Sequence, residues 1–133
     1  MKILFDTNIL ISTLLNPAST PAKALFHAAE HEKLVLTDYN IAELRRVAAE
    51  KFPNRLADID VLLAKLTFEL VIAPRDPSKL IADPKDAPIL NAAIVNEVDV
   101  IVSGDKHFLQ MDMEHPRVLK AAEYLAFAEE HGC

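Results

Sequence analysis

Short runs of apolar residues alternate along the chain with longer segments in which apolar residues recur every three or four positions. The short runs predict buried strands, and the longer segments predict helices with one apolar face. The predicted strands are KILF at 2–5, KLVLT at 33–37, a strand near LVIA at 70–73, VDVIVSGD at 98–105 with its terminal turn, and RVLK at 117–120. The predicted helices cover residues 8–15, 21–31, 38–52, 55–70, 86–97, 107–111 and 121–131.

This alternation predicts an α/β fold in which a parallel sheet is covered by helices on both faces. The clearest amphipathic helix is the one at 55–70, where leucine and isoleucine recur at alternating steps of three and four. These positions are Leu56, Ile59, Leu63, Leu66 and Leu70. A chain of 133 residues is the size of one ordinary domain, so we expect a single domain over residues 1–133.

Glycine and cysteine are scarce, which excludes several classes of site. With only Gly104 and Gly132, the chain cannot contain a glycine-rich dinucleotide or phosphate loop, nor the serine-hydrolase elbow. Cys133 is the only cysteine, which excludes a disulfide framework and a thiolate metal cluster and favours a cytoplasmic setting. No signal peptide or membrane span is predicted.

Asp6 interrupts an otherwise apolar N-terminal stretch, ILFDTNIL. A carboxylate directly after a buried strand is costly unless it is paired, hydrogen-bonded or bound to a cation. Asp105 lies just beyond the end of VDVIVS, residues 98–103. Because functional groups in open parallel sheets gather at the carboxyl ends of the strands, both acids are expected at the same edge.

Two further acids occupy sheet-facing rows of predicted helices. Glu43 lies between Tyr39 and Val47 on the flank of the apolar stripe of its helix. Asp86, in the first turn of the helix at 86–97, heads a row that we expect to face the sheet, and the helix dipole favours an anion there. The row consists of Ile89, Leu90, Ala93 and Ile94.

Each acid also has a purely structural interpretation. Asp86 fits a helix N-cap, Glu43 fits an ion pair with Lys51, Arg46 or another base, and Asp105 fits a turn. Taken together, clustered carboxylates repel one another unless a cation lies among them. Mg²⁺ or Mn²⁺ suits an all-oxygen site, where it can activate water for attack on a phosphodiester. The acids therefore predict nuclease chemistry.

Net charge at first argues against a nucleic-acid partner, because the 20 acids outnumber the 14 bases and give −6. Setting four acids aside as metal ligands reduces this to −2. Candidate contacts to a nucleic-acid backbone flank the acids, and each also fits a solvated helix face. They are Arg45, Arg46, Lys85 and Lys106.

Four motifs, in this order, resemble those of the PIN-domain nucleases, and more narrowly the toxin components of toxin–antitoxin pairs. They are FDTNIL, the helical AEL, DPKDAPIL and IVSGDKHFL. The resemblance implies a metal-dependent ribonuclease with a three-layer α/β/α sandwich around a central parallel sheet, a cognate antitoxin and a homodimer. By position, the acidic quartet that holds the metal is Asp6, Glu43, Asp86 and Asp105.

The same resemblance implies supporting roles for three polar residues. Thr7 and Asn8 match the polar pair after the first acid, and Ser103 matches a residue that can orient the last carboxylate. The chain departs from the family at His107, where many members carry a further acid. This departure favours one firmly held ion, with a second recruited by substrate, and makes His107 a candidate phosphate contact.

Three other hypotheses compete with this one. His27 and His31 have a spacing that can bind zinc, but the sequence offers no evident third ligand nearby. An aspartyl-phosphate protein ranks low, because DTN lacks the second acid of the phosphatase motif. A catalytically inert RNA-binding or scaffold module of the same fold remains the alternative from a different class.

Overall fold

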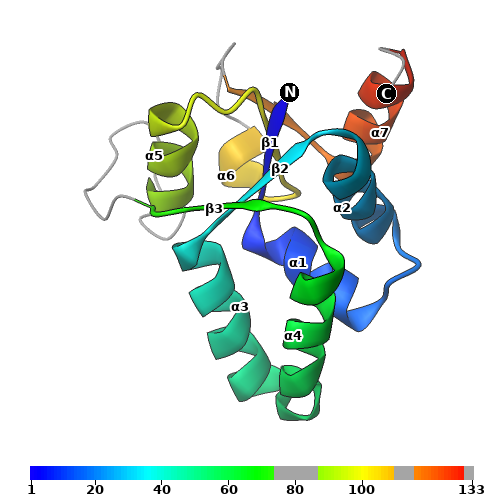
Figure 1. Cartoon of the computed structure of the whole chain (residues 1–133), viewed down its shortest axis with the longest axis vertical. Helices are drawn as coiled ribbons and strands as arrows, with labels where there is room; N and C mark the ends of the chain where they lie inside the picture. The colour runs from blue at the N-terminus through cyan, green and yellow to red at the C-terminus, as the bar shows by residue number, and fades with distance from the viewer. Residues whose placement is uncertain (74–86, 110–115, 131–133) are drawn as a thin grey trace.

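A central parallel sheet organises the fold. The computed structural model describes residues 1–73, 87–109 and 116–130 (Figure 1). Within these ranges five strands pair in the order β3-β2-β1-β4-β5, and every pair is parallel. The strands are β1 (Lys2–Phe5), β2 (Lys33–Thr37), β3 (Glu69–Val71), β4 (Val100–Val102) and β5 (Arg117–Leu119). The predicted parallel sheet is confirmed.

Helices begin where the sequence supplies caps. Ser19 accepts a hydrogen bond from the backbone N–H of Ala22 at the start of α2, where Pro21 occupies the first turn. A 3₁₀ turn, Pro53–Arg55, follows α3. The helices are α1 (Thr7–Leu15), α2 (Thr20–His31), α3 (Asp38–Lys51), α4 (Leu56–Lys65), α5 (Ala87–Val95), α6 (Lys106–Leu109) and α7 (Ala121–Glu130). In the described part of the chain, none is long and apolar enough to cross a bilayer.

The strands bury apolar side chains on both faces, as expected for a parallel sheet covered by helices. Ile3 and Phe5 of β1 point into a core shared with α1, α2 and α7, while Leu4 points into a second core with α5 and α6. Figure 1 shows these two helix groups on opposite sides of the sheet, with α3 and α4 extending beyond α1. The three-layer α/β/α architecture is therefore confirmed.

The predicted helix at 55–70 is wrong over its last five residues, 66–70. Helix α4 ends at Lys65, and β3 begins at Glu69 and pairs with β2. The recurrence of leucine continues past the helix end, but TFELVI is rich in the β-branched and aromatic residues that favour strands. As a result Leu70 lies on the edge strand with 54% of its surface exposed.

The predicted row on the helix at 86–97 is confirmed in part. Ile89, Leu90 and Ala93 of α5 are buried in the second core, whereas Ile94 is 43% exposed. The helix is described from Ala87 onward, so the N-terminal position that was predicted for Asp86 lies outside the described residues.

Candidate metal and catalytic site

Asp6 stands at the carboxyl end of β1, the central strand. Its N–H donates to the carbonyl oxygen of Val102 at 3.0 Å, which extends the pairing of β1 with β4 by one residue. Its own carbonyl accepts from Ile9 at 3.0 Å in the first turn of α1. Strand and helix thus fix the backbone of Asp6 from both sides and leave its side chain only 4% exposed.

Ser103 holds the Asp6 carboxylate. The Ser103 hydroxyl, which is fully buried, donates to Asp6 Oδ2 at 2.9 Å and accepts from the backbone N–H of Asp105 at 2.9 Å. The resemblance implied that Ser103 orients the last acid, Asp105. In the structure its hydroxyl contacts both acids, since it donates to the carboxylate of Asp6 and accepts from the backbone N–H of Asp105. The reason is that β1 and β4 are neighbours, so Ser103 lies directly beside Asp6.

The electrostatics at Asp6 link three of the four predicted acids. Burial is the main cause that raises the pKa of the Asp6 carboxyl above its usual 3.8. Hydrogen bonds from Ser103 and from the backbone of Asn8 lower this pKa, while the negative charges of Asp105 and Glu43 raise it further. The strand order β2-β1-β4 explains this convergence, because Asp6 lies between the segments that follow β2 and β4.

We expect Asp6 to give the metal-free protein a specific pH dependence. The folded state binds the Asp6 proton more tightly than the unfolded chain, because folding raises the pKa of this carboxyl. The stability that this bound proton contributes is therefore lost as the pH rises from the pKa of Asp6 in the unfolded chain through its pKa in the folded state. The free energy of unfolding falls by at most about 1.4 kcal/mol per pH unit in this range. The asparagine of Asp6→Asn cannot ionise, so the Tm of this variant in EDTA should rise relative to the Tm of the wild type between acidic and neutral pH.

The control for this measurement is Asp60→Asn, which changes an exposed carboxylate on α4 in the same way. Its Tm difference from wild type is expected to stay nearly constant over the same pH range. A difference for Asp6→Asn that does not change with pH would contradict the raised pKa of Asp6.

Glu43 extends from α3 toward this edge and is half-buried. It lines a hollow of about 290 Å³ with Tyr39, Ala42 and Arg46. One Arg46 nitrogen lies 3.9 Å from Glu43 Oε2, so the ion pair considered for Glu43 exists at the outer limit of contact. An ion pair this long with an exposed guanidinium contributes little, and it leaves the carboxylate able to engage a cation.

A buried polar network connects the start of α3 to the start of α1. Thr37 caps α3, and Asn40 completes the capping box. The Asn40 side chain also donates to Thr7 Oγ1 at 3.0 Å, and both residues are buried. Asn40 did not emerge from the sequence as a site residue, although T-x-x-N at the head of the helix was a recognisable capping signal. Asn8, the other residue of the predicted polar pair, is exposed, and its backbone is hydrogen-bonded to the Asp6 carboxylate.

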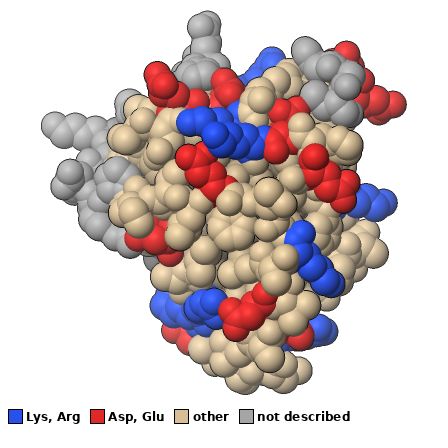
Figure 2. All heavy atoms as spheres, in the orientation of Figure 1, with Lys and Arg blue, Asp and Glu red and all other residues tan. Residues whose placement is uncertain are grey.

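The predicted RNA contacts occupy different surroundings. Arg45 is paired with Asp60 of α4 at 2.8 Å, whereas Arg46 lies between Glu43 and Glu50, and Lys106 is exposed beside Asp105. Lys85, Asp86 and the His107 side chain lie outside the described residues. Figure 2 shows basic and acidic side chains interspersed over the face that it presents, with no continuous basic surface among the described residues there.

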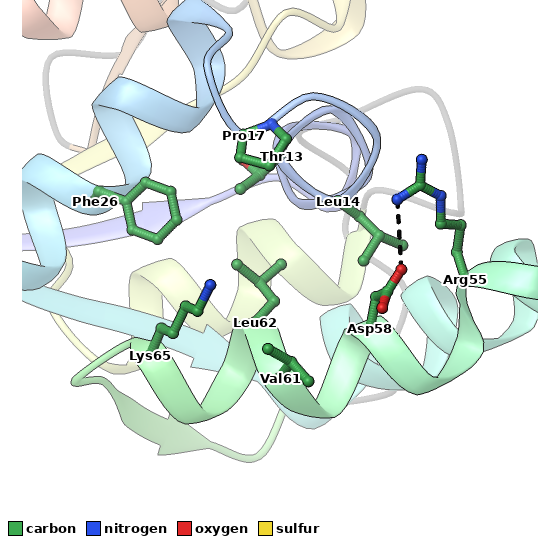
Figure 3. A pocket seen from close by; sticks show the side chains of 9 residues that line it. All are labelled: Thr13, Leu14, Pro17, Phe26, Arg55, Asp58, Val61, Leu62 and Lys65. Atoms are coloured by element: carbon green, nitrogen blue, oxygen red, sulfur yellow. Dashed lines mark hydrogen bonds and ion pairs between the residues drawn. The ribbon is translucent and has the colours of Figure 1, made fainter.

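Two other features are separate from the acidic edge. A groove of about 230 Å³ lies between α1, α2 and α4, where Phe26 and Leu62 face each other across it and the Arg55–Asp58 pair closes one end (Figure 3). On the other side of α2, His27 Nδ1 is hydrogen-bonded to Tyr124 Oη of α7 at 3.0 Å, which gives this histidine a structural partner.

The described residues do not form a closed metal cage. Among them, no three His, Cys, Asp or Glu side chains lie close enough together to hold an ion as they stand. Asp6, Glu43 and Asp105 nevertheless offer oxygen ligands from three adjacent segments and interact electrostatically. Oxygen donors without histidine or cysteine suit a hard divalent cation that keeps part of its water shell.

Comparison with known proteins identifies related sequences and folds. The family model described as PIN domain matches residues 2–107. An uncharacterized protein of Methanocaldococcus jannaschii is 26% identical over 125 residues, which covers 86% of this chain and 77% of that protein.

Solved structures share the fold at 16% identity. VapBC2 from Rickettsia felis, bound to a DNA fragment from its promoter, has a TM-score of 0.69 and covers 90% of this chain and 98% of its own. DNA-bound VapBC from Salmonella typhimurium has a TM-score of 0.67, with coverages of 91% and 98%. VapBC-1 from nontypeable Haemophilus influenzae has a TM-score of 0.63, with coverages of 92% and 99%.

Proposed function

The chain belongs to the PIN domain family, and on this premise we propose that it is a Mg²⁺- or Mn²⁺-dependent endoribonuclease that hydrolyses RNA phosphodiester bonds. The observation that carries the proposal is the environment of Asp6. Its carboxylate is buried, held by Ser103, and under the negative charge of Asp105 and Glu43. A divalent cation is the partner that relieves both the burial and the repulsion.

The residues present fit such an ion. Asp6, Glu43 and Asp105, together with Asp86 outside the described residues, would hold it. When bound, Mg²⁺ or Mn²⁺ supplies an activated water and offsets the charge that develops on the phosphodiester. The carboxylates of these four acids provide oxygen ligands only, which suits Mg²⁺ and Mn²⁺ better than zinc.

The chain's own side chains have distinct tasks in this proposal. Ser103 fixes the orientation of Asp6 before any ligand arrives, because its hydroxyl and the carboxylate are both buried. Arg46 and Lys106 flank Glu43 and Asp105 and would position the RNA backbone through its phosphates. Exposed ion pairs such as those of Arg46 are weak, so RNA phosphate can replace the acids as its partner. Lys85, His107 and Arg45 remain proposed contacts of the same kind.

The test is cleavage of end-labelled RNA in Mg²⁺ or Mn²⁺, with EDTA and with DNA of the same sequence as controls. We expect internal cuts in RNA that require the ion. An inert RNA-binding module would shift the RNA in a gel and leave it intact, and that result would overturn the proposed activity. Equal cleavage in EDTA would overturn the role of the metal.

We also propose that this protein is the toxin of a toxin–antitoxin pair, and that the antitoxin covers the acidic edge. Support comes from the four sequence motifs and from the likeness to solved VapBC structures. The test is co-expression with the product of the adjacent gene. We expect a stable complex in which RNA cleavage is lost and the Mn²⁺-induced rise in Tm is reduced. A neighbour that neither binds nor inhibits would contradict the assignment.

A further inference from the structure

The Asn40 side chain does more than cap α3. Its Oδ1 accepts from the backbone N–H of Thr37 at 3.1 Å and from the Thr37 hydroxyl at 2.9 Å. Because a backbone N–H can only donate, the atom that faces Thr37 must be the oxygen, and the amide nitrogen must face Thr7. A glutamate or glutamine ordinarily closes such a capping box. Asn40 closes it and additionally reaches a different helix.

The bond to Thr7 joins two residues that lie close to proposed metal ligands. Thr7 follows Asp6 in the chain, and Glu43 lies three residues after Asn40, on the adjoining part of the α3 surface. The hydrogen bond measures 3.0 Å and links residues 33 positions apart. It therefore connects the segment that carries Asp6 to the helix that carries Glu43, and the helices α1 and α3 pack side by side (Figure 1).

A second contact holds the same turn of α3 from the other side. Asp38 Oδ1 accepts from the backbone N–H of Ala73 at 2.8 Å, just beyond β3. The first turn of α3 is thus tied to the segment after β1 through Asn40 and to the segment after β3 through Asp38. Of these two ties, the one through Asn40 leads toward Asp6.

We propose that Asn40 is a positioning residue: its hydrogen bond to Thr7 fixes Glu43 relative to Asp6 and so sets the affinity of the acidic edge for a divalent cation. This inference rests on the proposed function, because it requires these acids to be ligands. The repulsion between Glu43 and Asp6 acts against their approach in the metal-free protein. A buried tie holds them together before the ion binds, and partners that orient metal ligands typically change affinity about 10–100-fold.

The experiment compares two valine substitutions in α1. Thr7→Val removes the acceptor of the Asn40 bond, and Thr13→Val removes an equally buried hydroxyl that bonds the carbonyl of Ile9 in its own helix at 2.9 Å. Thr7→Ser restores an acceptor. Thr7→Ala is made in parallel, so that the acceptor can still be tested if Thr7→Val fails to fold. The measurements are the Mn²⁺ dissociation constant by calorimetry without RNA and the Tm in EDTA.

We expect Thr7→Val and Thr7→Ala to weaken Mn²⁺ binding about tenfold or more, while Thr13→Val stays near wild type and Thr7→Ser recovers most of the affinity. Equal Mn²⁺ affinity in Thr7→Val and Thr13→Val, with wild type binding normally, would overturn the positioning role alone. If the Mn²⁺ affinity falls in both valine variants in proportion to the fall in their Tm, the loss reflects stability alone, and this result would overturn the positioning role as well. A wild-type protein that does not bind Mn²⁺ would overturn the proposed function and this inference together.

Discussion

Replacing Asp6 with asparagine is expected to lower RNA cleavage by on the order of 10²–10³-fold at saturating Mg²⁺. The proposed role of the ion is to stabilise the charge of the transition state, which is worth several kcal/mol, and about 1.4 kcal/mol corresponds to a factor of ten in rate. Asp6 is the acid at the centre of the edge, between the segments that carry Glu43 and Asp105. The measurement is the single-turnover rate on a labelled RNA.

The fold is expected to survive this change. The asparagine side chain has the same shape as aspartate and an oxygen that can accept from the Ser103 hydroxyl, and the substitution removes an ionisable group that burial disfavours. The variant should therefore be at least as stable as wild type in EDTA, which separates loss of chemistry from unfolding. Asp60→Asn serves as the matched control and is expected to cleave at the wild-type rate. Wild-type cleavage by Asp6→Asn would exclude this carboxylate from the reaction.

Divalent metal is expected to raise the Tm of the wild-type protein by about 10 °C at a hundredfold excess over the dissociation constant. A ligand that binds only the folded state stabilises it by about 2.7 kcal/mol at that excess. For a chain of this length, each kcal/mol shifts Tm by roughly 4 °C. The increase has a local origin, since the ion would offset the repulsion that Glu43 and Asp105 exert on Asp6. Thermal unfolding over a Mn²⁺ titration measures it.

Specific binding is distinguished from general ionic effects by comparing variants in the same titration. Asp6→Asn and Asp105→Asn are expected to lose most of the increase in Tm, whereas Asp60→Asn keeps it. If all three variants and the wild type respond alike to Mn²⁺, the ion acts through the general surface charge and the acidic edge is not its site.

Local patterns in the sequence were sufficient to predict the sheet and most of the helices. The strands at 2–5 and 33–37 were found with their observed bounds, because continuous apolar runs between polar turns are distinctive. Residues 66–70 were assigned wrongly, since leucine spacing alone does not distinguish the end of a helix from a following edge strand. There the pairing of β3 with β2, a contact distant in sequence, determined the structure.

The candidate site was predictable as far as it depends on strand ends. Asp6 stood out because it interrupts an apolar run, and the parallel topology placed Asp105 beside it. The partner of Ser103 could not be inferred, because it depends on which strands are neighbours. The role of Asn40 was hidden for the same reason. Its contact with Thr7 arises only when two distant helix starts meet.

The place of β1 in the sheet also has a consequence for biosynthesis. The strand nearest the N-terminus lies in the middle and pairs with segments that leave the ribosome later, at residues 33–37 and then 100–102. Such pairings between distant segments carry a large loop-closure cost and fold slowly. A nascent chain that ends before residue 105 lacks the segment that supplies Ser103 and Asp105, so the acidic edge assembles only after this segment has left the ribosome.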